Sequence, residues 1–289
     1  MPRTFRQFVY HREWLKEFNQ FIALSGVEDA TALPTAPPPM FRSLEFCDVT
    51  FVYPGMEKTV LRNLSLKIEP GKHYAFVGVN GAGKTTLTKL LTRLYDSYTG
   101  EILLNGKELR QWEMADIKAT FCALFQDFVR YDITVAENAA IGNANGATAE
   151  EIDRALQLAG FDAKAATLKE GKDTLLGKTH DDGVDLSGGE WQRLAFARAI
   201  LSPAAVKILD EPTAALDPIA ESRMYTQFEE IAHSFTTIFI SHRLASAKMA
   251  DVIYVLDGGR VTEAGNHDEL VKRGGTYAAM YESQRGWYL

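Results

Sequence analysis

The chain has 289 residues, which is enough for one large domain or two smaller ones with a sizeable core. Its formal net charge of -7 disfavours a nucleic-acid partner, and its two cysteines offer no disulfide framework and suit a reducing compartment. The sequence has no run of about 18 apolar residues, so we expect no part of it to span a bilayer.

The N-terminal residues 4–24 are predicted to form an amphipathic helix. Its apolar stripe contains Phe8, Leu15, Phe18 and Ile22, and charged residues occupy the other side. Residues 33–40 are rich in proline, which indicates an extended linker. A packing arm or a disordered leader is the alternative, but the density of aromatic residues favours a helix that docks on another surface.

Residues 78–85 fit the phosphate-binding pattern G-x-x-x-x-G-K-[ST]. The apolar residues 73–77 predict a strand before the loop, and leucines at 87, 90, 91 and 94 predict a helix after it. Glycines let backbone N–H groups wrap a phosphate that Cβ atoms would crowd, and the helix directs its positive end at the same phosphate. A glycine-rich turn that matches by chance is the alternative. The residues expected to contact the nucleotide here are Gly78, Val79, Asn80, Gly81, Ala82, Gly83, Lys84, Thr85 and Thr86.

Two of these side chains have more specific predicted tasks. Lys84 is expected to reach the β- and γ-phosphates of a nucleoside triphosphate, and the Thr85 hydroxyl is expected to ligate Mg²⁺.

The rest of the chain alternates between strand and helix patterns. Further strands are predicted at residues 44–53, 61–68, 100–106, 206–209 and 236–241, with a late hairpin formed by 252–256 and 261–264. Residues 127–201 are mainly helical in pattern, and two capping boxes, Thr134 with Glu137 and Thr148 with Glu151, predict helix starts there. The pattern predicts an α/β fold with a helical insertion.

The apolar strand at 206–209 ends in two acids, Asp210 and Glu211. In a parallel sheet this end lies beside the phosphate loop. We expect Asp210 to hold Mg²⁺ through water and Glu211 to polarise the water that attacks the γ-phosphorus. Lys207 interrupts the apolar run and predicts a less buried stretch of strand. Two acids that only cap a turn before Pro212 are the alternative.

A second anion-binding helix start is predicted at residues 186–190, which read Leu-Ser-Gly-Gly-Glu. Ser187 suits the N-cap, although composition alone would also allow a plain capped helix. Together with the phosphate loop and the acidic strand end, this segment resembles the signature motif of the nucleotide-binding domain of ATP-binding cassette (ABC) transporters. The resemblance covers roughly residue 43 to the C-terminus, and Glu190 departs from the usual LSGGQ.

The resemblance implies a fold and a domain organisation. It implies a P-loop NTPase core of mainly parallel sheet with flanking helices, an antiparallel N-terminal β subdomain, and a helical insertion subdomain at about residues 127–201. Residues 1–40 would be an amphipathic helix and linker from a membrane domain, and residues 41–289 the ABC nucleotide-binding domain.

The resemblance also assigns roles to four residues outside the loop. Tyr53 matches the aromatic residue that stacks on adenine, with an ordinary strand aromatic as the alternative. Gln126 matches the glutamine that reaches Mg²⁺ and the attacking water and links to the transmembrane part. Asp217 matches a loop that crosses between two subunits, and His242 matches the switch histidine that contacts the γ-phosphate.

In this family two domains pack head to tail, and each ATP lies between the phosphate loop of one and the signature of the other. The residues that would face the partner's nucleotide are Ser187, Gly188, Gly189 and Glu190. The resemblance therefore implies ATP and Mg²⁺ as cofactors, and a second nucleotide-binding domain and a transmembrane domain as partners. It implies no nucleic acid, and it allows either a homodimer or a heterodimer.

Two segments resemble the exporter type within this family: the arm before residue 41 and residues 125–138. Residues 174–183 fit the exporter pattern T-x-V-G-E-x-G only loosely. The resemblance implies a Mg-dependent ATPase that drives export from the cytoplasmic face of the cell membrane, with Lys84, Gln126, Glu211 and His242 as catalytic residues. The alternatives are a soluble ABC ATPase acting on nucleic acid or ribosomes, which the net charge disfavours, and a non-hydrolysing cassette, which the intact motifs disfavour.

Overall fold

The computed structural model describes residues 3–23, 33–163, 167–179, 183–213, 235–241 and 244–285. It divides the chain into two units, Met1–Ala32 and Leu33–Leu289. The first unit contains helix α1, Arg3–Ile22, where the sequence predicts an amphipathic helix. In α1 Trp14, Phe21 and Ile22 are more than half exposed, and the Trp14 and Phe18 rings stack with centroids 5.4 Å apart. Among the described helices, none is both long and apolar enough to cross a membrane.

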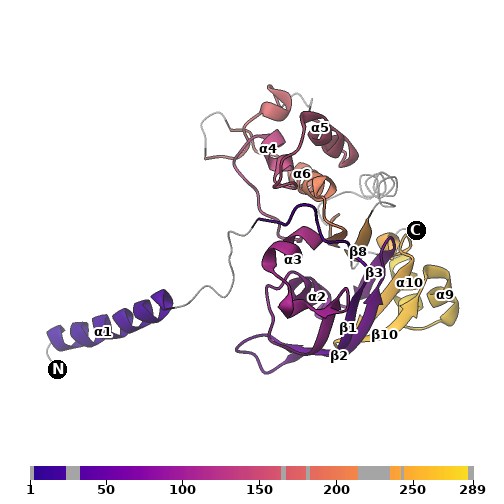
Figure 1. The fold of residues 1–289 in the computed structure, drawn as a ribbon, viewed down its shortest axis with the longest axis horizontal. Coiled ribbons are helices and arrows are strands. Elements are labelled where there is room, and N and C mark those ends of the chain that lie inside the picture. The colour runs from indigo at the N-terminus through magenta and orange to yellow at the C-terminus, as the bar shows by residue number, and fades with distance from the viewer. Residues whose placement is uncertain are drawn as a thin grey trace. The chain divides into compact units, whose positions relative to one another are not determined.

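The second unit begins with an antiparallel sheet of strand order β2-β1-β4-β5 (Figure 1). Its strands are β1 Leu44–Val52, β2 Thr59–Ile68, β4 Tyr98–Leu104 and β5 Lys107–Glu108. Asn105 and Gly106 have φ values of 54° and 79°, so they form the two-residue turn that an Asn-Gly pair predicts. This sheet is the antiparallel β subdomain expected from the resemblance.

The larger sheet has strand order β10-β9-β3-β8-β7-β6. Its strands are β3 His73–Gly78, β6 Phe121–Leu124, β7 Val206–Asp210, β8 Thr236–Ile240, β9 Val252–Asp257 and β10 Arg260–Gly265. Neighbouring strands from β9 to β6 are parallel, and β10 pairs antiparallel with β9. The mainly parallel sheet confirms the predicted fold class, and its parallel strands end at one common edge.

Helices flank this sheet and fill the connection between β6 and β7. The insertion contains α4 Val135–Ala140, α5 Ala149–Leu158 and α6 Gly188–Leu201, which gather together in Figure 1. The other helices in the described part of the chain are α2 Lys84–Leu91, α3 Met114–Thr120, α8 Leu244–Ala247, α9 His267–Arg273 and α10 Thr276–Arg285, with 3-10 turns at Leu109–Gln111 and Gly171–Asp173. Both predicted capping boxes, at Thr134 and Thr148, are present.

Two apolar cores lie on opposite faces of the larger sheet. In β3, Tyr74 and Phe76 pack with the leucines of α2 and with the β subdomain, whereas Ala75 and Val77 pack with α6 and the C-terminal helices. The alternation follows from the period of two in a strand. Because the strands are held from both faces, the positions of their carboxyl ends are fixed.

The helix after the phosphate loop is shorter than the leucine spacing predicts. Helix α2 ends at Leu91, and Leu94 is 60% exposed. The Thr92 hydroxyl donates to the Thr88 carbonyl at 2.9 Å, and Arg93 has a positive φ of 52°, which an α-helix does not accommodate.

The prediction of a less buried strand at Lys207 is wrong, because this side chain is only 1% exposed. Its ammonium is buried among backbone carbonyls, which supply the hydrogen bonds that water would otherwise provide.

Candidate active site

Three predicted site segments meet at the carboxyl edge of the larger sheet. The registers place Phe76 of β3, Ile240 of β8 and Asp210 of β7 at one level. The phosphate loop follows β3, Glu211 follows β7, and Gln126 comes two residues after β6, the neighbour of β7. The edge therefore brings the loop and the two carboxylates to one region, as the sequence predicts, and Gln126 follows the strand next to β7.

The phosphate loop has the backbone shape that its glycines allow. A Cβ on Gly78 would lie 2.2 Å from the Leu256 carbonyl oxygen, and Gly83 has a φ of 102° at the start of α2. The loop tip is open, because the Val79 side chain is 58% exposed. These features leave N–H groups of the loop and of the first turn of α2 available to an anion.

Lys84 lies folded against this loop. It is 7% exposed, and its Nζ donates to the Gly78 carbonyl at 2.7 Å and to the Val79 carbonyl at 3.1 Å. Burial lowers the pKa of Lys84, and the negative charges of Glu211 and Asp210 oppose that shift. The Lys84 ammonium is thus close enough to Asp210 and Glu211 to interact electrostatically with both carboxylates.

Asp210 is a buried carboxylate with one unused oxygen. It is 2% exposed, and burial raises its pKa to about 6, against a lowering effect from the hydrogen bond with the Thr85 side chain. In the described part of the chain, no hydrogen bond reaches its Oδ2. A hydroxyl and a carboxylate oxygen already in contact suit Mg²⁺, which prefers oxygen ligands and keeps several waters.

Asp210→Asn is expected to stabilise the nucleotide-free protein at pH 7. The folded-state pKa of about 6 lies above the ordinary 3.8, so ionisation is disfavoured in the folded state. This penalty is absent below about pH 4 and grows to about 1–3 kcal/mol above pH 6. Denaturant unfolding without Mg²⁺ should show the variant gaining stability over wild type between pH 4 and pH 7. Replacing the exposed Asp257 with asparagine should show no such trend, and a loss of stability in Asp210→Asn at pH 7 would contradict this account.

Glu211 has a strained backbone that two contacts hold in place. Its φ is 50°, which is unfavourable for a residue with a Cβ. Its N–H donates to the Ile240 carbonyl at 2.8 Å, and its own carbonyl accepts a hydrogen bond from Gln192 Nε2 at 3.2 Å. The strain and the contacts fix where the Glu211 side chain leaves the strand end.

Gln192 is a positioning contact that the sequence reasoning missed. It lies in α6 and is 4% exposed. The sequence does contain a sign of this contact: Gln192 is a polar residue next to Trp191 on a helix whose other buried positions are apolar. Such a residue in a buried face predicts a hydrogen bond to another element.

The signature segment starts α6 with the predicted N-cap. Ser187 Oγ accepts from the Glu190 N–H at 3.3 Å, and Glu190 Oε2 accepts from the Ser187 N–H at 2.8 Å. The departure from glutamine at position 190 therefore keeps a capping box, because either side chain can accept that bond. Ser187 and Gly188 are exposed, so this helix start is open to a ligand.

Tyr53 lies beside the helix that follows the phosphate loop. Its hydroxyl is 2.9 Å from Thr86 Oγ1, and its ring packs edge-on against Phe51 and Tyr95. A half-buried ring at this place fits a base-stacking role, which stays a prediction. Asp217 and His242 lie outside the described residues, so their predicted roles, like that of the exposed Gln126, stay predictions as well.

Comparison with known proteins gives concordant results. The family model described as ABC transporter matches residues 61–214. Over 243 residues the chain is 39% identical to the subtilin transport ATP-binding protein SpaT of Bacillus subtilis, covering 84% of this chain and 40% of that protein. It is 40% identical over 243 residues to the ATP-dependent lipid A-core flippase of Pseudoalteromonas atlantica, covering 84% of this chain and 41% of the flippase.

A solved structure resembles the whole fold. A bacterial Atm1-family ABC exporter with ATP bound superposes with a TM-score of 0.82 at 34% identity, covering 98% of this chain and 48% of the exporter chain. The present chain therefore spans less than half the length of these relatives.

Proposed function

Because this chain belongs to the ABC transporter family, we propose that it is the ATPase domain of an exporter and that it couples ATP hydrolysis to transport across a membrane. The observation that carries the proposal is the sheet edge where Lys84, Asp210 and Glu211 converge beside the phosphate loop. The relatives named above are a transport ATP-binding protein, a flippase and an exporter, and none of these three names indicates a nucleic-acid partner.

Nucleotide binding would use the N–H groups of the phosphate loop and the Lys84 ammonium. The loop N–H groups would receive the phosphates, and the Lys84 ammonium would exchange the Gly78 and Val79 carbonyls for β- and γ-phosphate oxygens. Thr85, Asp210 and Gln126 would hold Mg²⁺, directly or through water. An Mg²⁺ held by these residues would supply positive charge that offsets the negative charge developing on the phosphate.

Glu211 is the residue that we assign as general base. It would accept a proton from the water that attacks the γ-phosphorus, while Gln126 orients that water. His242 would contact the γ-phosphate from the end of β8, and Tyr53 would stack on adenine. Asp217 would lie in the loop that faces the second subunit.

The second half of each site would come from another copy of this domain or a related one. The exposed start of α6 at Ser187 supports this, because its N–H groups can receive an anion presented by a partner. In the head-to-tail pair, Ser187, Gly188, Gly189 and Glu190 would contact the partner's ATP.

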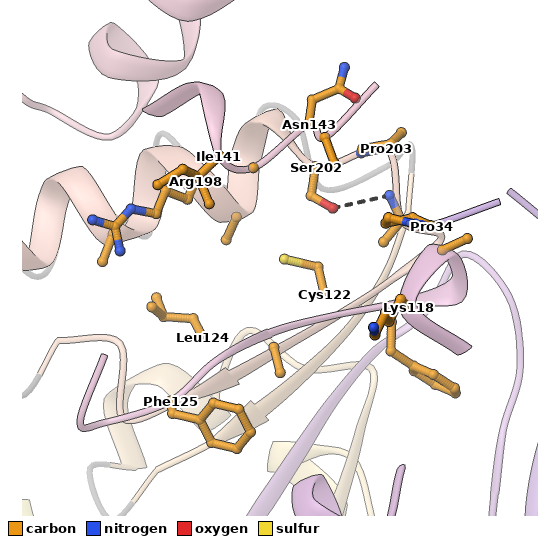
Figure 2. Close-up of a pocket in the computed structure, with 18 of the residues that line it drawn as sticks. Pro34, Lys118, Cys122, Leu124, Phe125, Ile141, Asn143, Arg198, Ser202 and Pro203 are labelled. Atoms are coloured by element: carbon orange, nitrogen blue, oxygen red, sulfur yellow. Dashed lines mark hydrogen bonds between the residues drawn. The ribbon is translucent and has the colours of Figure 1, made fainter. Parts of the chain in front are cut away.

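A groove of about 580 Å³ on this chain suits a segment of the transporter's membrane domain. Figure 2 shows Cys122 and Leu124 of β6 below it and Arg198 and Ile141 above it. Four of its lining side chains are large, apolar and exposed: Leu94 at 60%, Val129 at 57%, Tyr131 at 39% and Ile141 at 44%. Grouped exposed apolar residues mark interaction surfaces.

Two observations favour a membrane domain as the partner that occupies this groove. Pro34 and Thr35, just after the helical first unit, line the groove, and Thr35 donates from its hydroxyl to Asp116 at 2.7 Å. The relatives are more than twice as long as the region that matches. We therefore place the domain at the cytoplasmic face of a membrane, held there by the transmembrane part.

Steady-state phosphate release with and without Mg²⁺ tests the proposal, with Lys84→Ala as the diagnostic variant. Loss of a charge-assisted hydrogen bond to phosphate should weaken ATP binding by roughly 1.5–3 kcal/mol, or about 10- to 150-fold. Lys72→Ala is the matched control, because Lys72 is exposed and pairs with Glu69 at 2.6 Å. Equal ATP affinities of the two variants, or no phosphate release by the wild type, would contradict the proposal.

A further inference from the structure

Lys207 is a buried cation that the proposed reaction does not use. It lies in β7 three residues before Asp210 and is 1% exposed. Its Nζ donates to the carbonyls of Ala199 at 2.5 Å, Ser202 at 2.7 Å and Ile200 at 3.3 Å. All three carbonyls belong to the C-terminal end of α6, so one ammonium joins the strand to that helix end.

The environment of Lys207 shows how the charge is accommodated. Burial lowers the pKa of Lys207 to about 8, because the buried site disfavours the charged form. The ammonium therefore predominates at pH 7. It meets the negative end of the α6 dipole and lies 4.6 Å from the centroid of the Phe235 ring.

An apolar residue at position 207 would occupy the same volume but would not donate hydrogen bonds to the end of α6. Carbonyls in the last turn of a helix have no partner within the helix, and here Lys207 supplies three donors to them. A leucine or methionine would leave those carbonyls to be hydrated, which requires the helix end to move away from β7.

A second contact ties the first half of α6 to the residue that directly follows the same strand. Gln192 donates to the Glu211 carbonyl at 3.2 Å. The helix is thus attached to β7 through its last turn and to the residue after β7 through Gln192, and Ser187, the proposed anion-binding residue, caps its start. Strand β7 and helix α6 are therefore joined by two contacts and form one unit. Asp210 and Glu211 lie at the end of the strand in this unit, and Ser187 lies at the start of the helix.

We propose that Lys207 is a positioning residue that couples the two ATP sites of the dimer by locking the C-terminal end of α6 to β7. The inference rests on the proposed function, in which Ser187 serves the partner's ATP while Asp210 and Glu211 serve this chain's own. Asp210 and Glu211 are joined to Ser187 through β7 and α6. The position of this chain's own ATP therefore sets the position of the signature segment that contacts the partner's ATP.

The test uses Lys207→Met in a Glu211→Gln background, so that ATP is retained. Sedimentation velocity over a range of protein concentrations gives the dimer dissociation constant with ATP and Mg²⁺, and equilibrium titration at dilute protein gives the ATP affinity of the monomer. We expect the dimer constant to weaken about tenfold while the monomer's ATP affinity stays within about twofold. A merely structural role would lower thermal stability without separating these two constants.

Leu209→Met is the matched control, since Leu209 is a buried neighbour on β7 that packs in the same core as α6. Its dimer constant should stay within about twofold of the parent. Lys207→Met should fold, because removing a buried charge offsets lost hydrogen bonds. If it does not fold, Lys207→Gln takes its place with an expected weakening of about threefold.

The outcomes separate the two proposals. If the Glu211→Gln parent dimerises with ATP and the Lys207 variant has the same dimer dissociation constant, the role of Lys207 is wrong but the proposed function stands. Failure of the parent itself to dimerise with ATP would overturn the proposed function, and the coupling role with it.

Discussion

Glu211→Gln is expected to lower steady-state ATP turnover about 10²- to 10⁴-fold, because a positioned general base contributes a factor of that size. ATP binding should stay within a few-fold of wild type, since the amide is isosteric and the phosphate loop is untouched. The two backbone contacts of residue 211, with Ile240 and Gln192, do not depend on its side chain and should persist. The variant should accumulate as an ATP-bound dimer.

Glu211→Asp is the informative companion to this variant. It keeps the carboxylate, and aspartate tolerates the φ of 50° at least as well as glutamate, but the side chain is one methylene shorter. Its turnover should fall between those of the wild type and Glu211→Gln. Phosphate release by Glu211→Gln at the wild-type rate would remove Glu211 as the base, whatever the shorter variant does.

Ser187→Asp is expected to abolish ATP-driven dimerisation and leave ATP binding by the monomer unchanged. Aspartate is as good an N-cap as serine, so the start of α6 should be retained once the Glu190 carboxylate, which accepts from the Ser187 hydroxyl at 2.6 Å, turns away from the new charge. Its negative charge would face the partner's γ-phosphate, and like charges at an interface cost several kcal/mol. The dimer constant should therefore weaken by at least about 100-fold, as measured by sedimentation velocity with ATP.

Ser187→Asn separates the charge from the change in size. Asparagine has nearly the shape of aspartate and also caps helices well, but it is neutral. Its dimer constant should weaken by less than about tenfold. If the asparagine and aspartate variants dimerise equally, or if the aspartate variant loses ATP binding as a monomer, the role of Ser187 toward a partner's phosphate is wrong.

The polar groups at the sheet edge are poised for a ligand in the free protein. Asp210 Oδ2 has no hydrogen bond from the described residues, the Lys84 ammonium rests on two carbonyls, and Glu211 has a positive φ. The Asp210 oxygen and the positive φ of Glu211 cost stability in the free protein, and a cation bound at Asp210 would relieve the first of these costs.

Much of the fold followed from local rules in the sequence. The capping boxes at Thr134 and Thr148, the N-cap at Ser187 and the Asn105–Gly106 turn are short-range interactions, so residue identity and spacing were sufficient to predict them. The convergence of the phosphate loop and the two acids followed from the parallel order of their strands.

Other features depend on tertiary packing that spacing does not encode. Lys207 looks like an interruption of an apolar strand, and its burial depends on carbonyls at the end of a helix that precedes it in the chain. Gln192 meets Glu211 only because α6 packs beside β7. Leu94 continues the leucine spacing, but the helix has already ended at Leu91.

The most direct test of the shared ATP site is a mixture of two inactive variants. Lys84→Ala lacks a working phosphate loop and Ser187→Asp lacks a working signature, so neither homodimer contains an intact site. A mixed dimer contains one intact site, made from the loop of the Ser187 variant and the signature of the Lys84 variant. Phosphate release by an equimolar mixture should rise above the rates of both variants alone, to at most about a quarter of the wild-type rate, because random pairing would make half of the dimers mixed and each mixed dimer has one intact site of two. A mixture that is no faster than the two variants measured separately would contradict the claim that each ATP lies between two subunits.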